Sequence, residues 1–182
     1  MTHIKIISYV YTKKLLNFII AYWTWLRNPF TRPASHTEIG FNLTRDDLNY
    51  MRKTYPEKIA DLPTHAGWWY FSSTMRDGAN GCRWIYRDDV IKYKERWIMQ
   101  EHKSWERPKW LMLDECCKML GCRYDKLGIA GFITPVPLNE KNAWYCSEAV
   151  WKIFMGFWKK RISPRTLIAK AEKLGFNYVE MA

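Results

Sequence analysis

The sequence has no C-x-x-C pair and no histidines at the spacing of metal ligands, although it contains five cysteines. A structural zinc site needs such ligand pairs, and a disulfide framework needs cysteines that can all be paired. The odd number of cysteines argues against both and fits reduced thiols in a cytosolic compartment. No metal or organic cofactor is implied by this pattern.

The chain also lacks an apolar run long enough to span a membrane. The run at residues 15–26 contains Asn17 and is flanked by basic residues, whereas a spanning helix needs ~20 predominantly apolar residues. Its bulky residues and the absence of an A-x-A-like cleavage site argue against a signal peptide. We expect residues 1–30 to form an N-terminal helical segment packed on the domain, with an interfacial membrane helix as the second choice.

Acidic residues are few relative to basic ones, which gives a formal net charge of +11 and a pI near 9.5. Such a positive field attracts anionic surfaces, including nucleic acid, anionic lipid headgroups and acidic cell-wall polymers. The basic residues are dispersed, however, and no glycine-rich phosphate loop is followed by a lysine. Nucleic acid is therefore the weakest of these partners.

The remaining composition predicts one globular domain over residues 1–182. The chain is 48% hydrophobic and has no internal repeats, which suffices for one core but hardly for two. An aromatic content of 16%, with 11 Trp and 11 Tyr, indicates large side chains that line a cleft as well as fill a core.

Local patterns predict the following elements: a strand at 38–43, a helical excursion from a Thr44 cap to Ile59, a hairpin of 68–75 with 82–86, a helical or mixed stretch containing Trp97 and Trp105, a helix at 110–120, and a C-terminal helix at 166–174 before a last strand at 176–179. Turn chemistry at Asp77-Gly78 and Asn80-Gly81 supports the hairpin. Ser163-Pro164 is a typical helix start. We therefore expect an α+β fold in which a small antiparallel sheet packs on helices.

The pentapeptide Tyr145-Cys146-Ser147-Glu148-Ala149 is the most informative stretch of the chain. The aromatic residues Trp144 and Tyr145 precede Cys146, and an apolar helix is expected to begin at this cysteine. The positive end of a helix favours a thiolate. A base is absent nearby, but His36 opens a strand-like alternation far upstream. Cysteine hydrolases show such a distant cysteine and histidine. The alternative is that Cys146 is an ordinary buried thiol.

Four segments, in their order along the chain, together resemble a known family: Ser35-His36-Thr37-Glu38-Ile39, the stretch 69–78, the loop 124–129 and Trp144-Tyr145-Cys146-Ser147-Glu148. The chain resembles the circularly permuted branch of the NlpC-type, papain-like cysteine amidases and peptidases. The closest likeness is to the YiiX-like group and its small relatives in tailed bacteriophages. In that branch the histidine strand precedes the cysteine helix, as His36 precedes Cys146 here.

The resemblance implies a circularly permuted papain-like fold and a catalytic pair in which Cys146 is the nucleophile and His36 is the acid and base. The backbone N–H of Cys146 is expected to help hold the oxyanion. A third polar group usually orients the histidine, and Ser72 is the first candidate, with Asp77 as an alternative. Glu38 shares a strand face with His36 and is expected to line the cleft rather than to orient the histidine.

Three further residues are candidates for substrate binding. Tyr124 and Tyr145 are expected to line the cleft near the nucleophile, although a tyrosine at position 124 could equally anchor a loop. Glu148 could touch substrate, but its place in the first helical turn already has a structural reason in the helix dipole.

Two classes of function follow. The first is a cysteine hydrolase of amide, ester or thioester bonds, with peptidoglycan stem peptides as the leading substrate and lipid or other acyl groups as the alternative. The second is a non-catalytic papain-like module that binds a phage or host partner. The expected location is the host cytoplasm or the virion, and the expected partners are a peptide or acyl substrate and an anionic cell-wall polymer or membrane surface.

Overall fold

The computed structural model describes residues 1–10, 18, 22, 34–75, 80–126, 142–157 and 162–181. The strands are β1 (Thr2–Tyr9), β2 (His36–Leu43), β3 (Gly67–Thr74), β4 (Gly81–Tyr86), β5 (Trp97–Trp105), β6 (Arg123–Tyr124), β7 (Ala143–Trp144) and β8 (Asn177–Val179). The helices are α2 (Arg45–Thr54), α3 (Arg87–Ile91), α4 (Lys109–Met119), α6 (Cys146–Met155) and α7 (Pro164–Lys173), with short 3-10 helices η1 (Pro56–Asp61) and η2 (Lys94–Arg96).

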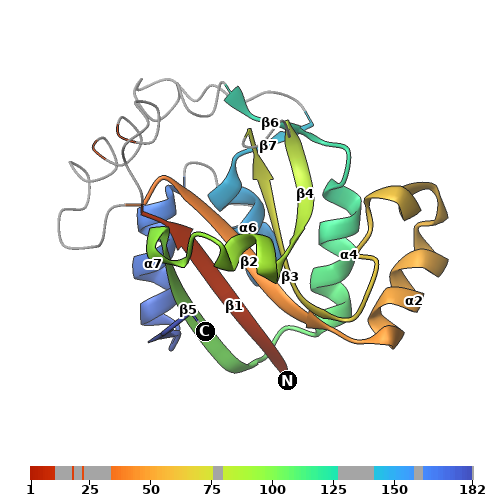
Figure 1. Ribbon diagram of the computed structural model, residues 1–182, viewed down its shortest axis with the longest axis horizontal. Coiled ribbons are helices and arrows are strands. Elements are labelled where there is room, and N and C mark those ends of the chain that lie inside the picture. The colour runs from red at the N-terminus through yellow and green to blue at the C-terminus, as the bar shows by residue number, and fades with distance from the viewer. Residues whose placement is uncertain are drawn as a thin grey trace.

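Six strands form one antiparallel sheet in the order β4-β3-β2-β1-β5-β8. The short strands β6 and β7 form a separate parallel pair. Figure 1 shows helices α4, α6 and α7 behind this sheet, with α2 beyond its edge. The expected α+β class with an antiparallel sheet is confirmed in this architecture.

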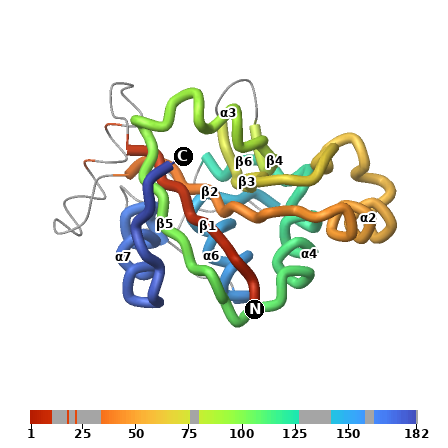
Figure 2. Tube along the Cα trace, turned by 60° about the horizontal axis from the view of Figure 1, so that its bottom comes forward, coloured from red at the N-terminus to blue at the C-terminus, as the bar shows by residue number. Residues whose placement is uncertain are grey.

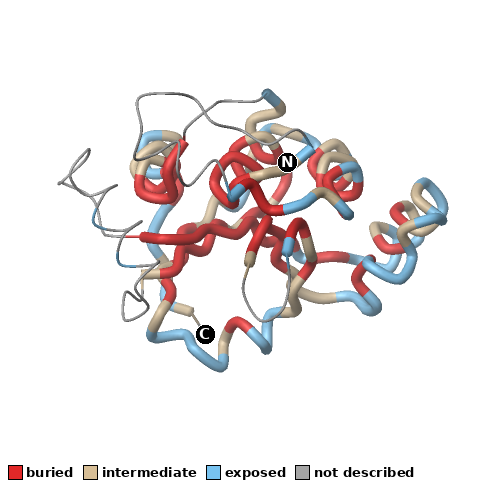
Figure 3. The backbone as a smooth tube through the Cα atoms, turned by 90° about the horizontal axis from the view of Figure 1, so that it is seen from above, coloured by how far each residue is buried: buried red, intermediate tan, exposed pale blue. Residues whose placement is uncertain are grey.

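Both faces of the sheet are buried, which explains the many large side chains. On the helix face, alternate strand residues such as Ile6, Ile39 and Phe71 pack with apolar residues of α4, α6 and α7. On the opposite face, Tyr9, Tyr70 and Trp97 form a second cluster with Val90 of α3. Figure 3 shows the central strands as a continuous buried band, and Figure 2 shows how the chain connects these layers. The sheet therefore separates two apolar layers.

Two helix starts were predicted by local signals and are confirmed. The Thr44 hydroxyl accepts a hydrogen bond from the Asp47 amide, while the Asp47 carboxylate accepts one from the Thr44 amide, so both free N–H groups are satisfied. The Ser163 hydroxyl accepts a hydrogen bond from the Thr166 amide at 3.1 Å.

Three expectations need correction. Helix α2 ends at Thr54 and a 3-10 helix follows, because the residue before Pro56 is disfavoured in the α conformation. The stretch with Trp97 and Trp105 is strand β5, which pairs with β1 on one side and β8 on the other.

The N-terminal segment is the third correction. Residues 2–9 form β1, a strand inside the sheet, rather than the start of a helical segment over 1–30. Of the expected helix at 15–26, the structure describes Phe18 and Tyr22, which are helical, exposed and stacked with ring centroids 5.9 Å apart. None of the helices among the described residues has the length and apolar character that crossing a membrane requires.

The glycine that begins β4 provides a test of the fold. Gly81 has φ +146°, and a Cβ there would lie 2.2 Å from the backbone oxygen of Cys122. Gly121 also has a positive φ, +85°, but a Cβ there would meet nothing within 4 Å. We predict that Gly81→Ala lowers the free energy of unfolding by about 3 kcal/mol, and that Gly121→Ala costs only about 1 kcal/mol. Urea denaturation of both variants measures the difference, and equal losses would contradict the close approach of β4 to Cys122.

Candidate active site

His36 and Cys146 interact directly, through charge and a side-chain hydrogen bond. His36 is the first residue of β2, and Cys146 is the first residue of α6, which packs on β2 and β3. The exposed fractions are 5% for His36 and 0% for Cys146. The fold thus brings together two residues that are far apart in the sequence, and it excludes water from them.

The electrostatics of His36 depend on this neighbourhood. Burial by itself would lower the pKa of His36, but the charge of Cys146, hydrogen bonding with Cys146 and interaction with Glu38 raise it to about 9. Each of these interactions favours the imidazolium. His36 is therefore charged at neutral pH when Cys146 carries a negative charge.

Glu38 and Ser72 both contact the same ring nitrogen of His36. The Glu38 Oε1 atom lies 3.2 Å from Nε2 of His36, and both side chains are buried. The Ser72 Oγ atom lies 3.5 Å from Nε2 and donates its hydrogen bond to the backbone oxygen of Thr37 at 2.7 Å. Because the Ser72 proton is directed to the backbone, Ser72 can only accept weakly from the ring. Glu38 makes the shorter, charge-assisted contact.

Two tyrosines pack against Cys146. Tyr145 precedes α6 as its N-cap residue, and its ring lies 5.8 Å from that of Tyr124, centroid to centroid. Both pack with Cys146 and Met75 in one small cluster. Burial raises the pKa of both phenols, so they stay neutral. The structure thus brings Tyr124 and Tyr145 to Cys146, and their expected role in lining a substrate cleft stays a prediction.

Glu148 lies in the first turn of α6 and is buried. In the described part of the chain, no side chain caps the start of this helix. A carboxylate in the first turn interacts favourably with the helix dipole. The helix dipole therefore explains a glutamate at position 148. The charge of Glu148 also raises the pKa of Tyr145.

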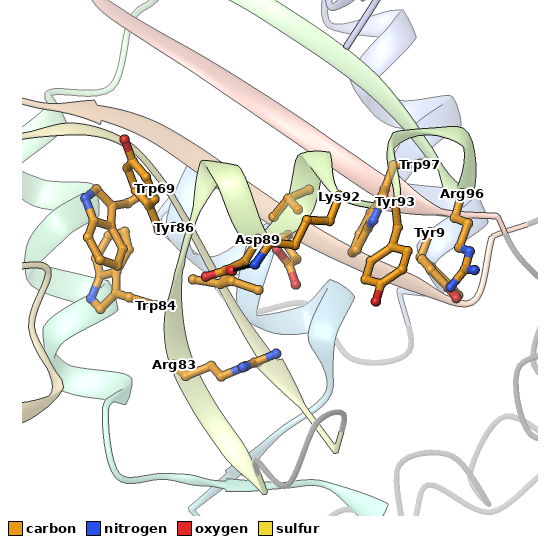
Figure 4. A pocket seen from close by; sticks show the side chains of 13 residues that line it. Tyr9, Trp69, Arg83, Trp84, Tyr86, Asp89, Lys92, Tyr93, Arg96 and Trp97 are labelled. Carbon is orange, nitrogen blue, oxygen red and sulfur yellow. Dashed lines mark hydrogen bonds and ion pairs between the residues drawn. The ribbon is translucent and has the colours of Figure 1, made fainter. Parts of the chain in front are cut away.

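A cavity of about 620 Å³ adjoins the histidine side of the site. Figure 4 shows Tyr9, Tyr93, Arg96 and Trp97 at one end of it and Trp69, Trp84 and Tyr86 at the other. An ion pair between Asp89 and Lys92, with 2.7 Å between the charged atoms, lies between the two ends. Glu38 both lines this cavity and hydrogen-bonds to His36, so a wall residue of the cavity contacts His36.

Sequence reasoning missed Tyr9 and Trp97 at this site. Tyr9 pairs with His36 across β1 and β2, and the ring of Trp97 meets that of His36 with centroids 6.2 Å apart. Only the pairing of strands brings these residues to His36, so no local signal could have found them. Asp77, the alternative orienting residue, lies outside the described residues. Within the described ranges, no group of three or more His, Cys, Asp or Glu side chains could hold a metal ion.

Comparisons with known proteins add no relative. A scan against protein-family models, a search of curated proteins and a search of solved structures each found no match.

The raised pKa of His36 gives a direct test. In the wild type, the imidazole should titrate near pH 9. We predict that Cys146→Ala lowers this pKa strongly, because the opposing effect of burial then remains, and that Glu38→Gln lowers it less. Histidine C–H resonances followed by NMR across pH 5–10 measure all three proteins, with His65, which is exposed, as the internal control. If the pKa of His36 is the same in the wild type and in Cys146→Ala, the two side chains do not interact as described.

Proposed function

We propose that the protein is a cysteine hydrolase that cleaves an amide, ester or thioester bond through an acyl-enzyme. The observation that carries the proposal is the position of His36, which interacts with Cys146 and hydrogen-bonds to Glu38, and whose pKa is raised to about 9 by these two neighbours. A nucleophile, a base and a group that orients the base together form the arrangement that nucleophilic catalysis requires.

In the first step, the Cys146 thiolate attacks the substrate carbonyl carbon and a C–S bond forms. The carbonyl oxygen becomes an oxyanion, and the N–H of Cys146 at the start of α6 donates a hydrogen bond to it. His36 then gives its proton to the leaving amine, alcohol or thiol as the bond to the carbonyl carbon breaks.

In the second step, neutral His36 takes a proton from water, whose oxygen attacks the acyl carbon. The C–S bond breaks, the acid is released, and the thiolate and imidazolium are restored. A raised pKa favours the charged state to which His36 returns. No step requires a metal ion.

Glu38 orients His36 in this scheme. Its carboxylate accepts from Nε2–H, which leaves Nδ1 to exchange the proton with Cys146 and stabilises the imidazolium. Ser72 instead holds the end of β2 through the backbone oxygen of Thr37.

The order of elements supports the finer fold assignment, a circularly permuted papain-like domain. The histidine lies on a strand of an antiparallel sheet, the cysteine begins a helix that packs on that strand, and the strand comes first in the chain. This is the arrangement that the resemblance implied.

Peptidoglycan stem peptides are the leading substrate that we propose, with lipid or other acyl groups as the alternative. The aromatic walls of the cavity beside Glu38 suit either a sugar-peptide or an acyl chain. The positive charge of the chain favours anionic polymers and membrane surfaces.

A second candidate, the non-catalytic binding module, is favoured by the burial of Cys146, which has 0% exposure. A substrate reaches this thiol only after the residues that cover it move. The two candidates predict different reactivities for Cys146. An activated Cys146 reacts faster than more exposed cysteines, whereas in a binding module the reactivity of each cysteine follows its exposure.

Brief iodoacetamide treatment near pH 6, followed by peptide mapping, separates them. An ordinary thiol with a pKa of ~8.5 is almost wholly protonated at that pH. Cys122 is more exposed than the other described cysteines, which are buried, so access alone would favour Cys122. We predict that Cys146 reacts first, and that His36→Ala slows its reaction by roughly tenfold or more.

Cys146→Ala is the matched control, since it removes the predicted adduct and leaves Cys122 in place. Labelling that follows exposure, with Cys122 ahead of Cys146 and no effect of His36→Ala, would favour the binding module. If Cys146 does react first, hydrolysis of peptidoglycan fragments and of acyl esters, each compared with Cys146→Ala, identifies the bond.

A further inference from the structure

Arg165 is a buried cation for which the described residues supply no hydrogen-bonded counter-charge. It is the second residue of α7 and has 0% exposure. Nε and both terminal guanidinium nitrogens have no hydrogen-bond partner in the structure as described. Burial lowers the pKa of Arg165, which reflects the cost of keeping its charge away from water. A buried arginine normally pairs with an anion.

The strand register shows where Arg165 lies. The Gln100 amide nitrogen donates to the backbone oxygen of Ile168 at 3.3 Å, and Arg165 is one helical turn before Ile168. A Cβ on Gly175, just after α7, would lie 3.6 Å from Nε2 of His102, whereas Ile168 lies beside Gln100, so α7 and β5 run in the same direction. Arg165 therefore lies above Ile98, two residues before Gln100 on the same sheet face. Figure 1 shows α7 beside β5.

The same row of the sheet carries two buried hydroxyl groups. Ile98 pairs with Ser8, and Ser8 pairs with Thr37, so all three side chains share the sheet face on which α6 and α7 pack. The exposed fractions are 1% for Ser8 and 0% for Thr37. Among the described residues, neither Ser8 Oγ nor Thr37 Oγ1 has a hydrogen-bond partner. These hydroxyls and the guanidinium can all donate hydrogen bonds.

Gln100 does not satisfy the cation. Its Oε1 is also buried and, within the described structure, has no partner, so it is not bonded to Arg165. In the sequence, residues 156–171, which include most of α7, contain neither Asp nor Glu. Lys159, Lys160 and Arg161 precede α7. In the described part of the chain, no carboxylate is hydrogen-bonded to Arg165.

This unsatisfied group lies next to the candidate active site. The Ser147 hydroxyl donates to the backbone oxygen of Ile162, so the start of α7 lies beside the start of α6. Two helix N-termini thus meet here, and each favours a negative charge. Thr37 lies between His36 and Glu38 in β2.

We propose that Arg165, with the hydroxyls of Ser8 and Thr37, binds an oxyanion of the substrate, a carboxylate or a phosphate, beside Cys146. This inference rests on the proposed function only in naming the ligand as substrate. The substrate is then an anionic amide or ester rather than a neutral one. Planar bidentate recognition by a guanidinium suits both groups.

Binding of inorganic phosphate to the Cys146→Ser protein tests the site without turnover. Isothermal titration is compared for this protein and for the same protein carrying Arg165→Met, Thr37→Val or Arg45→Gln. Arg45 is exposed in α2. Arg45→Gln removes the same charge as Arg165→Met and is therefore the matched control. We expect Arg165→Met to weaken binding by about tenfold or more and Thr37→Val by about threefold, with no change for Arg45→Gln.

Thermal unfolding adds a readout of opposite sign. Because the free protein leaves a buried charge unpaired, Arg165→Met should raise the Tm without phosphate and abolish the increase in Tm that phosphate gives. If Arg165→Met fails to fold, the isosteric Thr37→Val decides by the same binding comparison. Equal phosphate binding in the wild-type and variant sites would overturn the proposal.

Competition against phosphate identifies the source of the anion. One arm uses an N-acyl dipeptide with a free carboxylate and its carboxamide, and the other uses a short-chain phosphatidic acid. Stronger competition by the carboxylate indicates a peptide substrate, and stronger competition by the phosphatidic acid indicates a lipid. Failure of both to compete overturns the assignment to substrate. Since Cys146 is absent, failure of the hydrolase proposal leaves these measurements unaffected.

Discussion

Helix α6 is buried on almost every side, and the rest of the fold is arranged to cover it. Eight of its residues are buried, including the polar Ser147 and Glu148 in its first turn. The sheet covers one side through β2 and β3, while α4 and α7 cover others. Near its other end, the Trp105 indole donates to the backbone oxygen of Phe154 at 3.0 Å. Dense packing on several sides restrains this helix and therefore the position of Cys146 against His36.

The sequence predicted elements whose signals are local. The hairpin of β3 and β4, the capped start of α2 and the Ser163 start of α7 each depend on a few neighbouring residues. Strands β1 and β5 were missed because they are stabilised by pairing with each other. The stretch Trp97–Trp105 carries polar residues at its end and has no turn signal, so its periodicity did not distinguish a strand from a helix.

Some residues of the candidate site could likewise be predicted from local patterns, and others could not. Cys146 and His36 could be identified because a helix start and a strand alternation surround them. The preference for Glu38 over Ser72 could not, since it depends on which side chain reaches Nε2 and on the use of the Ser72 proton by Thr37. Trp97 and Arg165 become neighbours of the site only through strand register and helix packing. Such long-range contacts leave no pattern in a single sequence.

The proposed function requires that Cys146 and His36 form a thiolate and imidazolium pair. The ultraviolet thiolate absorbance at neutral pH measures it most directly, in the wild type, Cys146→Ser and His36→Ala. Burial raises the pKa of Cys82, Cys116 and Cys117, so these thiols stay protonated and do not contribute. We expect the wild type to absorb more than either variant, by the equivalent of about one thiolate. A neutral-pH absorbance that is the same in all three proteins would contradict the pair.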